Sequence, residues 1–231
     1  MFKNRTLKKE VPGLAGIEVT LPGAAMACGA LLFDMDGVLV DSLDTIERHL
    51  HDWALGRGLD PRHVVAVSPG RTNAELVAEV APHLDAAAEA RLLLEREITD
   101  IGGIAACAGA ARILQRLDGR AWAVVTSGHR PVALNRLAAA GLPTPDVLIT
   151  ADDVTAGKPD PEGYLAAAHR LGVPPGDCVV IEDAAAGLHA ARTAGMRAIA
   201  IEDGKGGPHA PYDHAVASLA LLDVRVNDHA A

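Results

Sequence analysis

Aromatic residues are scarce in this 231-residue sequence, at 3%, and basic residues are outnumbered by acidic ones, 21 against 30, which gives a net charge of −9. Proteins that bind nucleic acids neutralise phosphates with Lys and Arg, or stack unpaired bases on aromatic side chains. We therefore expect no nucleic-acid partner. A small phosphate can still bind to an acidic protein where local donors or a metal ion outweigh the mean charge.

Long apolar segments and paired cysteines are absent as well. No apolar run approaches the roughly 18–20 residues needed to span a bilayer, so we expect no membrane partner. The three cysteines, Cys28, Cys107 and Cys178, are widely spaced and form no CxxC motif. This usage is typical of a reduced, cytoplasmic chain rather than a disulfide framework.

The first 28 residues are basic at their start and interrupted by Pro and Gly. They lack the continuous apolar core of a secretory signal. Met26 would be a natural first residue, just before the first clear apolar run. We predict that residues 1–28 form a poorly ordered N-terminal tail, and that residues 1–25 need not belong to the native protein.

Five short apolar runs are each followed by polar residues: 30–33, 121–125, 147–149, 178–181 and 198–201. Most alternate with helix-period stretches, as in repeated βαβ units. The pattern predicts an α/β protein with a Rossmann-like parallel β-sheet core flanked by helices. In such sheets ligands bind beyond the carboxyl ends of the strands, where the polar residues lie.

The alternation stops between residues 44 and 111. Segments 45–55, 74–80 and 86–98 have helical periodicity, with no clear strand among them. We predict an inserted α-helical cap at 44–111 and a core made of residues 29–43 and 112–231. Hinges are expected near 42–44 and 103–109, where the pattern breaks.

Four polar groups follow the strands or lie in loops near them: the pair Asp34 and Asp36, then Thr126, then Lys158, then the pair Glu182 and Asp183. Each has an ordinary structural explanation, because Asp-Gly, Thr-Ser-Gly and Gly-Lys-Pro are common in turns and helix caps. Their arrival in order, each at a strand end or just beyond one, favours a single site.

Carboxylate oxygens from Asp34, Glu182 and Asp183, with one backbone carbonyl, suit a partly hydrated Mg²⁺. Such an ion would allow neighbouring carboxylates to stay ionised together. Asp34 could then attack phosphorus as a nucleophile and form an aspartyl-phosphate. Asp36, two residues further along an extended strand end, lies on the same side and could transfer protons.

The remaining residues of the pattern suit a phosphate. Thr126 and the backbone N–H groups of Ser127 and Gly128 could hold phosphoryl oxygens, and Lys158 would add positive charge. Gly37 would leave room for the backbone to approach the phosphate.

The motifs DMDGVLVDS, VVTSG, GKPDPEGYL and IEDAAAG resemble the four ordered motifs of the haloacid dehalogenase (HAD) superfamily, and the helical insert resembles its C1-type cap. The resemblance covers residues 29–226. It implies that Asp34 is the nucleophile and Asp36 the acid/base, that Thr126 binds the phosphate, and that Lys158 bridges nucleophile and phosphate. It also implies that Asp34, Glu182, Asp183 and the backbone carbonyl of Asp36 bind magnesium.

Within the superfamily the motifs are most similar to those of small sugar phosphatases. The caps of that group carry a Ser-His-Gly-x-Arg-like stretch, and residues 68–73, Ser-Pro-Gly-Arg-Thr-Asn, lie at the matching place. Pro69 departs from the usual histidine. Arg71 and Asn73 could contact a hydroxyl-rich leaving group; alternatively, Gly70 and Thr72 simply begin the next helix.

We therefore expect a monomeric, Mg²⁺-dependent phosphatase that hydrolyses small sugar or polyol phosphates. The alternatives are a phosphosugar mutase similar to β-phosphoglucomutase and a phosphoglycolate phosphatase. A hydrolytic dehalogenase is disfavoured, because Asp36 would have no alkoxide to protonate. A non-catalytic binding module is disfavoured because every residue that the chemistry requires is present.

Overall fold

The computed structural model describes residues 16–117, 120–202 and 210–227. Its centre is a sheet of parallel strands in the order β10-β9-β8-β3-β6-β7. The predicted α/β class with a parallel, helix-flanked sheet is confirmed. The strands are β3 (Ala30–Phe33), β6 (Trp122–Val125), β7 (Val147–Ile149), β8 (Cys178–Glu182), β9 (Arg197–Ile201) and β10 (His214–Val216).

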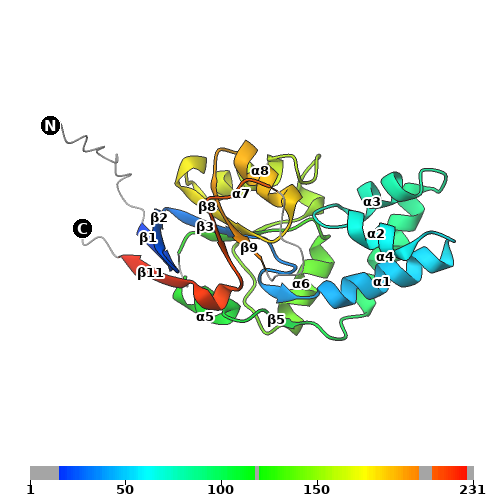
Figure 1. Ribbon diagram of the computed structural model, residues 1–231, viewed down its shortest axis with the longest axis horizontal. Helices are drawn as coiled ribbons and strands as arrows, with labels where there is room; N and C mark the ends of the chain where they lie inside the picture. The colour runs from blue at the N-terminus through cyan, green and yellow to red at the C-terminus, as the bar shows by residue number, and fades with distance from the viewer. Residues whose placement is uncertain (1–15, 118–119, 203–209, 228–231) are drawn as a thin grey trace.

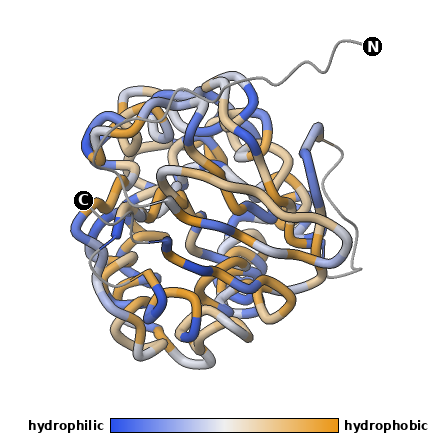
Figure 2. Tube along the Cα trace, turned by 90° about the vertical axis from the view of Figure 1, so that its left-hand side faces the viewer, coloured by the Kyte–Doolittle hydropathy of each residue, from blue (hydrophilic) through white to orange (hydrophobic). Residues whose placement is uncertain are grey.

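Both faces of this sheet are buried (Figure 1). Successive residues of β3 point to opposite faces, so Leu31 and Phe33 join one hydrophobic cluster while Ala30 and Leu32 join the other. The faces are covered by helices α5 (Ala110–Arg116), α6 (Arg130–Ala139), α7 (Glu162–Leu171) and α8 (Ala185–Thr193). Apolar and polar stretches alternate along the chain (Figure 2), as expected for helices with one face on a sheet.

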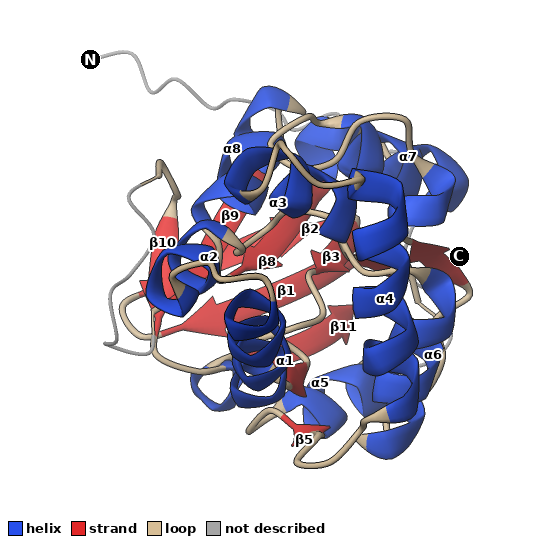
Figure 3. Cartoon of the chain, turned by 90° about the vertical axis from the view of Figure 1, so that its right-hand side faces the viewer, coloured by secondary structure: helices blue, strands red, loops and turns tan. Residues whose placement is uncertain are grey.

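Four helices follow the first strand of the sheet: α1 (Leu43–Gly56), α2 (Pro61–Val67), α3 (Asn73–Val80) and α4 (Ala86–Thr99). They enclose a separate hydrophobic cluster that includes Leu50, Trp53, Val64 and Leu93. Figure 3 shows them in front of one edge of the sheet. We call α1–α4 the cap, and we propose that they form a unit distinct from the core. Of the three helices predicted here, all are present, and α2 was not predicted.

The two chain segments that join cap and core run side by side. Strand β4 (Val40–Asp41) pairs antiparallel with β5 (Ala105–Ala106). The hydroxyl of Thr45 donates to the carbonyl oxygen of Gly102 at 2.7 Å, which fastens the first turn of α1 to the returning segment.

The prediction of a disordered tail is wrong for residues 16–28. Strands β1 (Gly16–Leu21) and β2 (Ala24–Cys28) form a hairpin, and β1 also pairs antiparallel with β11 (Asp223–Asn227) near the other end of the chain. Met26 lies inside this sheet, 6% exposed. Residues 1–15 of the predicted tail lie outside the described residues.

The hairpin is ordered because its apolar residues complete the main core. Ile17, Val19 and Leu21 alternate along β1 and are each at most 5% exposed, in the same cluster as Phe33. The strands are joined by Pro22-Gly23, with Gly23 at φ +79°, the combination that a type II turn requires.

Three 3₁₀ turns complete the description: Ala151–Asp153, Pro175–Asp177 and Leu219–Leu221. Across the described ranges, no helix has the length and apolar character that crossing a membrane would require.

Substituting Val19→Ala should lower the free energy of unfolding by about 2 kcal/mol, because it removes two buried methyl groups and leaves a cavity beneath the sheet. Thr20→Ala is the matched control, since Thr20 is exposed on the same strand; its effect should stay within about 0.5 kcal/mol. Urea denaturation followed by circular dichroism measures both. Equal effects of the two substitutions would show that the hairpin does not belong to the core.

Candidate active site

The carboxyl ends of three neighbouring strands bring the predicted residues together. β3 pairs in register with β8 on one side and with β6 on the other, so Phe33 lies opposite Ile181 and opposite Val124. Asp34 and Thr126 therefore extend beyond the same edge of the sheet. The backbone N–H of Asp34 donates to the carbonyl oxygen of Ile181 at 2.9 Å, which continues the ladder to the site itself.

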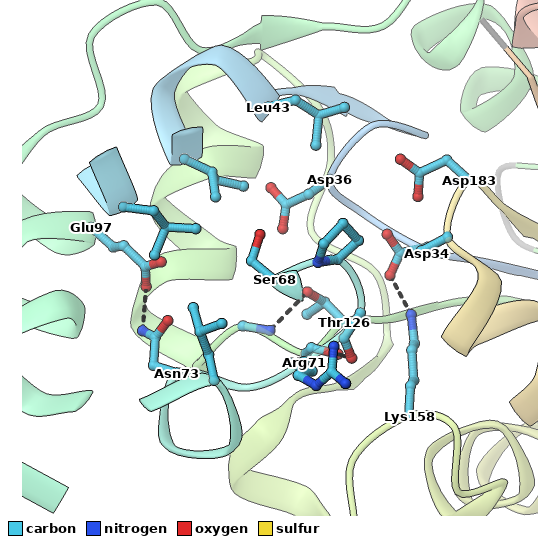
Figure 4. Close-up of a pocket in the computed structure, with 18 of the residues that line it drawn as sticks. Asp34, Asp36, Leu43, Ser68, Arg71, Asn73, Glu97, Thr126, Lys158 and Asp183 are labelled. Carbon is cyan, nitrogen blue, oxygen red and sulfur yellow. Dashed lines mark hydrogen bonds and ion pairs between the residues drawn. The ribbon is translucent and has the colours of Figure 1, made fainter. Parts of the chain in front are cut away.

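Lys158 contacts residues of all three strand ends or the residue just after them. Its ammonium group is buried and donates to Asp34 Oδ1 at 2.5 Å, to Glu182 Oε1 at 2.6 Å and to the carbonyl oxygen of Val125 at 3.2 Å. All three ammonium hydrogens thus have an acceptor. Asp34 Oδ2 accepts no hydrogen bond from the residues in the described ranges. Figure 4 shows Lys158 pointing at Asp34 from the side opposite Asp183.

Three carboxylates crowd this site. Oxygens of Asp34, Glu182 and Asp183 all lie within 4.8 Å of one another. Burial raises the pKa of Asp34 from 3.8 to about 7; Lys158 opposes the shift, and Glu182 and Asp36 add to it. The pKa of Asp183 is also raised well above its usual range, first by burial and then by Glu182 and Asp34. The single positive charge of Lys158 does not compensate for the negative charge of three carboxylates.

A hard divalent cation fits these residues. Within the described part of the chain, no group donates a hydrogen bond to the side chain of Asp183, although this side chain faces the other carboxylates. Glu182 is fixed by the Tyr164 hydroxyl at 3.0 Å and by the backbone N–H of Ala184 at 2.9 Å. A cluster that offers only oxygen ligands and carries excess negative charge is typical of a Mg²⁺ site.

Glycines make room for the two acidic residues that follow β8. A Cβ at Gly187 would lie 1.6 Å from Glu182 Oε1, and a Cβ at Gly37 would lie 2.1 Å from Asp183 Oδ2. Gly37 also has φ +79°, which favours glycine. We predicted that Gly37 leaves room for the backbone to approach the phosphate, and this stays a prediction; the group that lies against Gly37 in the structure is the carboxylate of Asp183.

Asp36 has different neighbours from Asp34. Its Oδ1 accepts hydrogen bonds from the Ser42 hydroxyl at 2.5 Å and from Arg136 Nη1 at 2.8 Å. Both donors are on one oxygen, so Oδ2 remains available for another partner. The carboxylate of Asp36 is not part of the acidic cluster of Asp34, Glu182 and Asp183.

The cap covers this edge of the sheet and closes a cavity of about 240 Å³. The Ser127 hydroxyl donates to the carbonyl oxygen of Gly70 at 2.8 Å, directly linking core and cap. Gly70 packs so close to α8 that a Cβ there would lie 2.7 Å from the Cβ of Ala186. Both core and cap residues among those we predicted line the cavity: Asp34, Asp36, Arg71, Asn73, Thr126, Ser127, Gly128, Lys158, Glu182 and Asp183.

Segment 68–73 both lines the cavity and begins a helix. Thr72 is the N-cap of α3, in a capping box with Glu75. The guanidinium of Arg71 donates to the carbonyl oxygen of Val67, and Asn73 Nδ2 donates to Glu97 Oε2 at 3.2 Å. The two sequence interpretations of this stretch are therefore compatible.

The charged residues of the cavity wall that were not predicted include Glu97 on α4 and Arg136 on α6. In sequence both occur in helical segments with charges at regular intervals, which is typical of a solvent-exposed face. Tyr164, which holds Glu182, was also missed; its position six residues after Lys158, in the motif GKPDPEGYL, was the only available signal.

The chain belongs to the haloacid dehalogenase-like hydrolase family, whose model matches residues 28–195. It is 44% identical to hexitol phosphatase A of Escherichia coli over 180 residues, 76% of this chain and 83% of that protein. It is 34% identical to glycerol-1-phosphate phosphohydrolase 2 of Saccharomyces cerevisiae, over 78% and 77% of the two chains. The family resemblance predicted from the four motifs is confirmed, and with it an enzyme of the hydrolase class.

Solved structures agree with this family. CbbY from Rhodobacter sphaeroides, in complex with phosphate, superposes with a TM-score of 0.72 at 28% sequence identity, covering 84% of this chain and 95% of that one. The likeness extends over cap and core together.

Mg²⁺ should stabilise the protein, and more so at pH 8 than at pH 5. Because the pKa of Asp34 is higher in the folded than in the unfolded chain, the metal-free protein loses stability as pH rises from about 4 to about 7. A bound cation restores this stability at pH values at which the carboxylates are ionised. At about 100 times its dissociation constant, Mg²⁺ contributes about 2.7 kcal/mol, which raises Tm by about 5–10 °C.

Differential scanning fluorimetry with Mg²⁺ or EDTA measures this shift. Asp183→Asn should abolish it while leaving the metal-free Tm at pH 8 unchanged or higher, because the substitution relieves the crowded charge. A metal-induced shift of the same size at both pH values would contradict the prediction.

Proposed function

We propose that this protein is a Mg²⁺-dependent phosphatase that hydrolyses small sugar or polyol phosphate monoesters through an aspartyl-phosphate. One observation carries the proposal: the two carboxylates at the end of β3 have different hydrogen-bond partners and different electrostatic surroundings. Asp34 is held by Lys158 within the acidic cluster, and Asp36 is held through one oxygen outside it. Two carboxylates in different environments can divide nucleophilic and proton-transfer roles.

In the first step an oxygen of Asp34 bonds to phosphorus as the bond from phosphorus to the leaving oxygen breaks. Asp36, protonated on Oδ2, gives its proton to that oxygen, and the sugar or polyol leaves as an alcohol. In the second step Asp36 takes a proton from water, whose oxygen attacks phosphorus. The bond to Asp34 breaks, and inorganic phosphate is released.

The other core residues bind the phosphoryl group. The Thr126 hydroxyl, which accepts from the backbone N–H of Gly128 at 3.1 Å, and the backbone N–H of Ser127 would donate to its oxygens, and Lys158 would add positive charge next to the nucleophile. Asp34, Glu182, Asp183 and the backbone carbonyl of Asp36 would hold Mg²⁺. When bound, the ion supplies positive charge that keeps the carboxylates ionised and stabilises the transferring phosphoryl group.

The cap side of the cavity supports a hydroxyl-rich leaving group. Ser68 and Asn73 line it and can bond to hydroxyl groups. Arg136 of α6 is paired with Asp36 and Glu97, whereas Arg71 donates to the carbonyl oxygen of Val67 and keeps its positive charge in the cavity wall. We favour small sugar or polyol monophosphates, and thus a phosphatase over a mutase. The activities named for the hexitol and glycerol phosphatases above support the same class.

We propose a cytoplasmic monomer without nucleic-acid or membrane partners. The three cysteines are free, and burial raises the pKa of each thiol to about 12. Thiols of this kind persist in a reducing compartment. The net charge of −9 disfavours binding to nucleic acid.

Phosphate release should be measured on a panel of hexitol phosphates, glycerol-1-phosphate, 2-deoxyglucose-6-phosphate, 2-phosphoglycolate and β-glucose-1-phosphate, with Mg²⁺ or EDTA. We expect Mg²⁺-dependent turnover that is highest on the polyol esters. Asp34→Asn should lower kcat by at least about 10³-fold, since it removes the nucleophile. Acid-quenched native enzyme should carry a phosphoryl group on the peptide that contains Asp34.

Asp85→Asn is the matched control, because it makes the same chemical change at the exposed N-cap of α4, where Asn is an equally good cap. It should retain native activity. Isomerisation of β-glucose-1-phosphate without net phosphate release would replace this proposal with a mutase. Absence of phosphate from every ester, with the chain folded, would reject it.

A further inference from the structure

Arg136 joins the carboxylate of Asp36 to the cap. It projects from α6 of the core, is 3% exposed, and lies between two carboxylates. Its Nη1 donates to Asp36 Oδ1 at 2.8 Å, and its Nη2 lies 3.7 Å from Glu97 Oε1 on α4. Arg136 belongs to none of the four motifs, and no role in the proposed reaction has yet been given to it.

The contacts continue to the wall of the cavity. Glu97 Oε2 accepts from Asn73 Nδ2 at 3.2 Å, and Asn73 lines the cavity from the first turn of α3. Beside this path, Asn135 Nδ2 on α6 donates to the carbonyl oxygen of Ile98 at 3.3 Å. Helices α4 and α6 are thus joined by a charged and a neutral contact one residue apart on each helix.

The charges along this path depend on the cap. A guanidinium removed from water is costly unless carboxylates and hydrogen bonds compensate for it. The core supplies one such carboxylate and α4 supplies the second. Nη2 has no hydrogen-bond partner within the described residues, so the charge of Glu97 is its compensation at that side. If α4 moved away, Arg136 would lose one of its two carboxylate partners and, with it, the contact that fixes the position of Nη2.

We propose that Arg136, held by Glu97 of the cap, is a positioning residue that orients the carboxylate of Asp36 for proton transfer to the leaving oxygen. This inference rests on the proposed function, in which Asp36 is the general acid. Arg136 and Ser42 both donate to Oδ1 of Asp36, so the carboxylate cannot rotate without losing these two hydrogen bonds. Oδ2 is thereby the oxygen that meets the leaving group, and only while α4 lies against α6.

The leaving group distinguishes this role from a structural ion pair. An alkoxide must receive a proton as it departs, whereas acetate departs from acetyl phosphate without one. A residue that orients the general acid should therefore matter for polyol phosphates and not for acetyl phosphate. A residue that only stabilises the fold should affect both equally. The comparison uses kcat/KM, which reports the steps up to departure of the leaving group.

The test compares Arg136→Met, Arg136→Lys and Glu97→Gln with the native chain, using the best polyol phosphate of the panel and acetyl phosphate. We expect kcat/KM on the polyol ester to fall about 10²-fold in Arg136→Met and about 10-fold in Glu97→Gln. On acetyl phosphate the fall should stay within about 3-fold. Arg136→Lys should recover part of the loss, because it keeps the charge but not the planar fork that reaches both partners.

Two control variants match these changes. Glu95→Gln alters the same helix two residues away, at an exposed pair with Arg91. Arg57→Met removes an arginine that pairs with Glu89 inside the cap. Both should retain native kcat/KM on both substrates, and circular dichroism should show all variants folded. If Arg136→Met fails to fold, Arg136→Lys and Glu97→Gln decide the question.

An equal loss on both substrates, or no loss on the polyol ester, overturns the inference. These outcomes differ from failure of the proposed function, in which the native chain itself would release no phosphate from either substrate.

Discussion

Excess negative charge at the end of β3 and β8 is the constraint on which the rest of this structure depends. Three carboxylates share a largely buried volume with one ammonium group, Lys158. An uncompensated buried charge is far more costly than most packing contacts. The neighbouring features follow from that cost: Tyr164 and a backbone N–H hold Glu182, glycines leave room for its carboxylate and for that of Asp183, and the cluster favours a divalent cation.

Close approach of the cap is the second requirement, and small residues permit it. Gly70 meets α8 of the core, and Gly157, one residue before Lys158, meets Glu75 of α3, where a Cβ would lie 2.8 Å from a carboxylate oxygen. With the hydrogen bond from Ser127 to Gly70, these contacts bring the cap backbone onto the loops that carry Ser127 and Lys158. The proposed nucleophile and the cap residues proposed to contact the leaving group therefore line the same cavity.

The sequence was sufficient for the parallel sheet and for the core of the site, because apolar runs that end in polar residues have few alternative structures. It was insufficient for Arg136 and Glu97, since only the packing of α4 on α6 buries charges that resemble those of an exposed helix face. The hairpin was missed for a different reason. Its own signals are local, since Ile17, Val19 and Leu21 alternate as strand residues do and Pro22-Gly23 marks the turn. The pairing of β1 with β11, some two hundred residues later, is not encoded locally.

The pairing of β4 with β5 has a mechanical consequence. Two separate linkers would allow the cap to swing, twist and slide, because each could change its backbone angles independently. The antiparallel pairing of Val40 and Asp41 with Ala106 and Ala105 makes the linkers one ribbon, and a ribbon bends easily in only one direction. A cap that moved on this ribbon would turn about a single axis, and each return to the core would bring the same side chains into the same register.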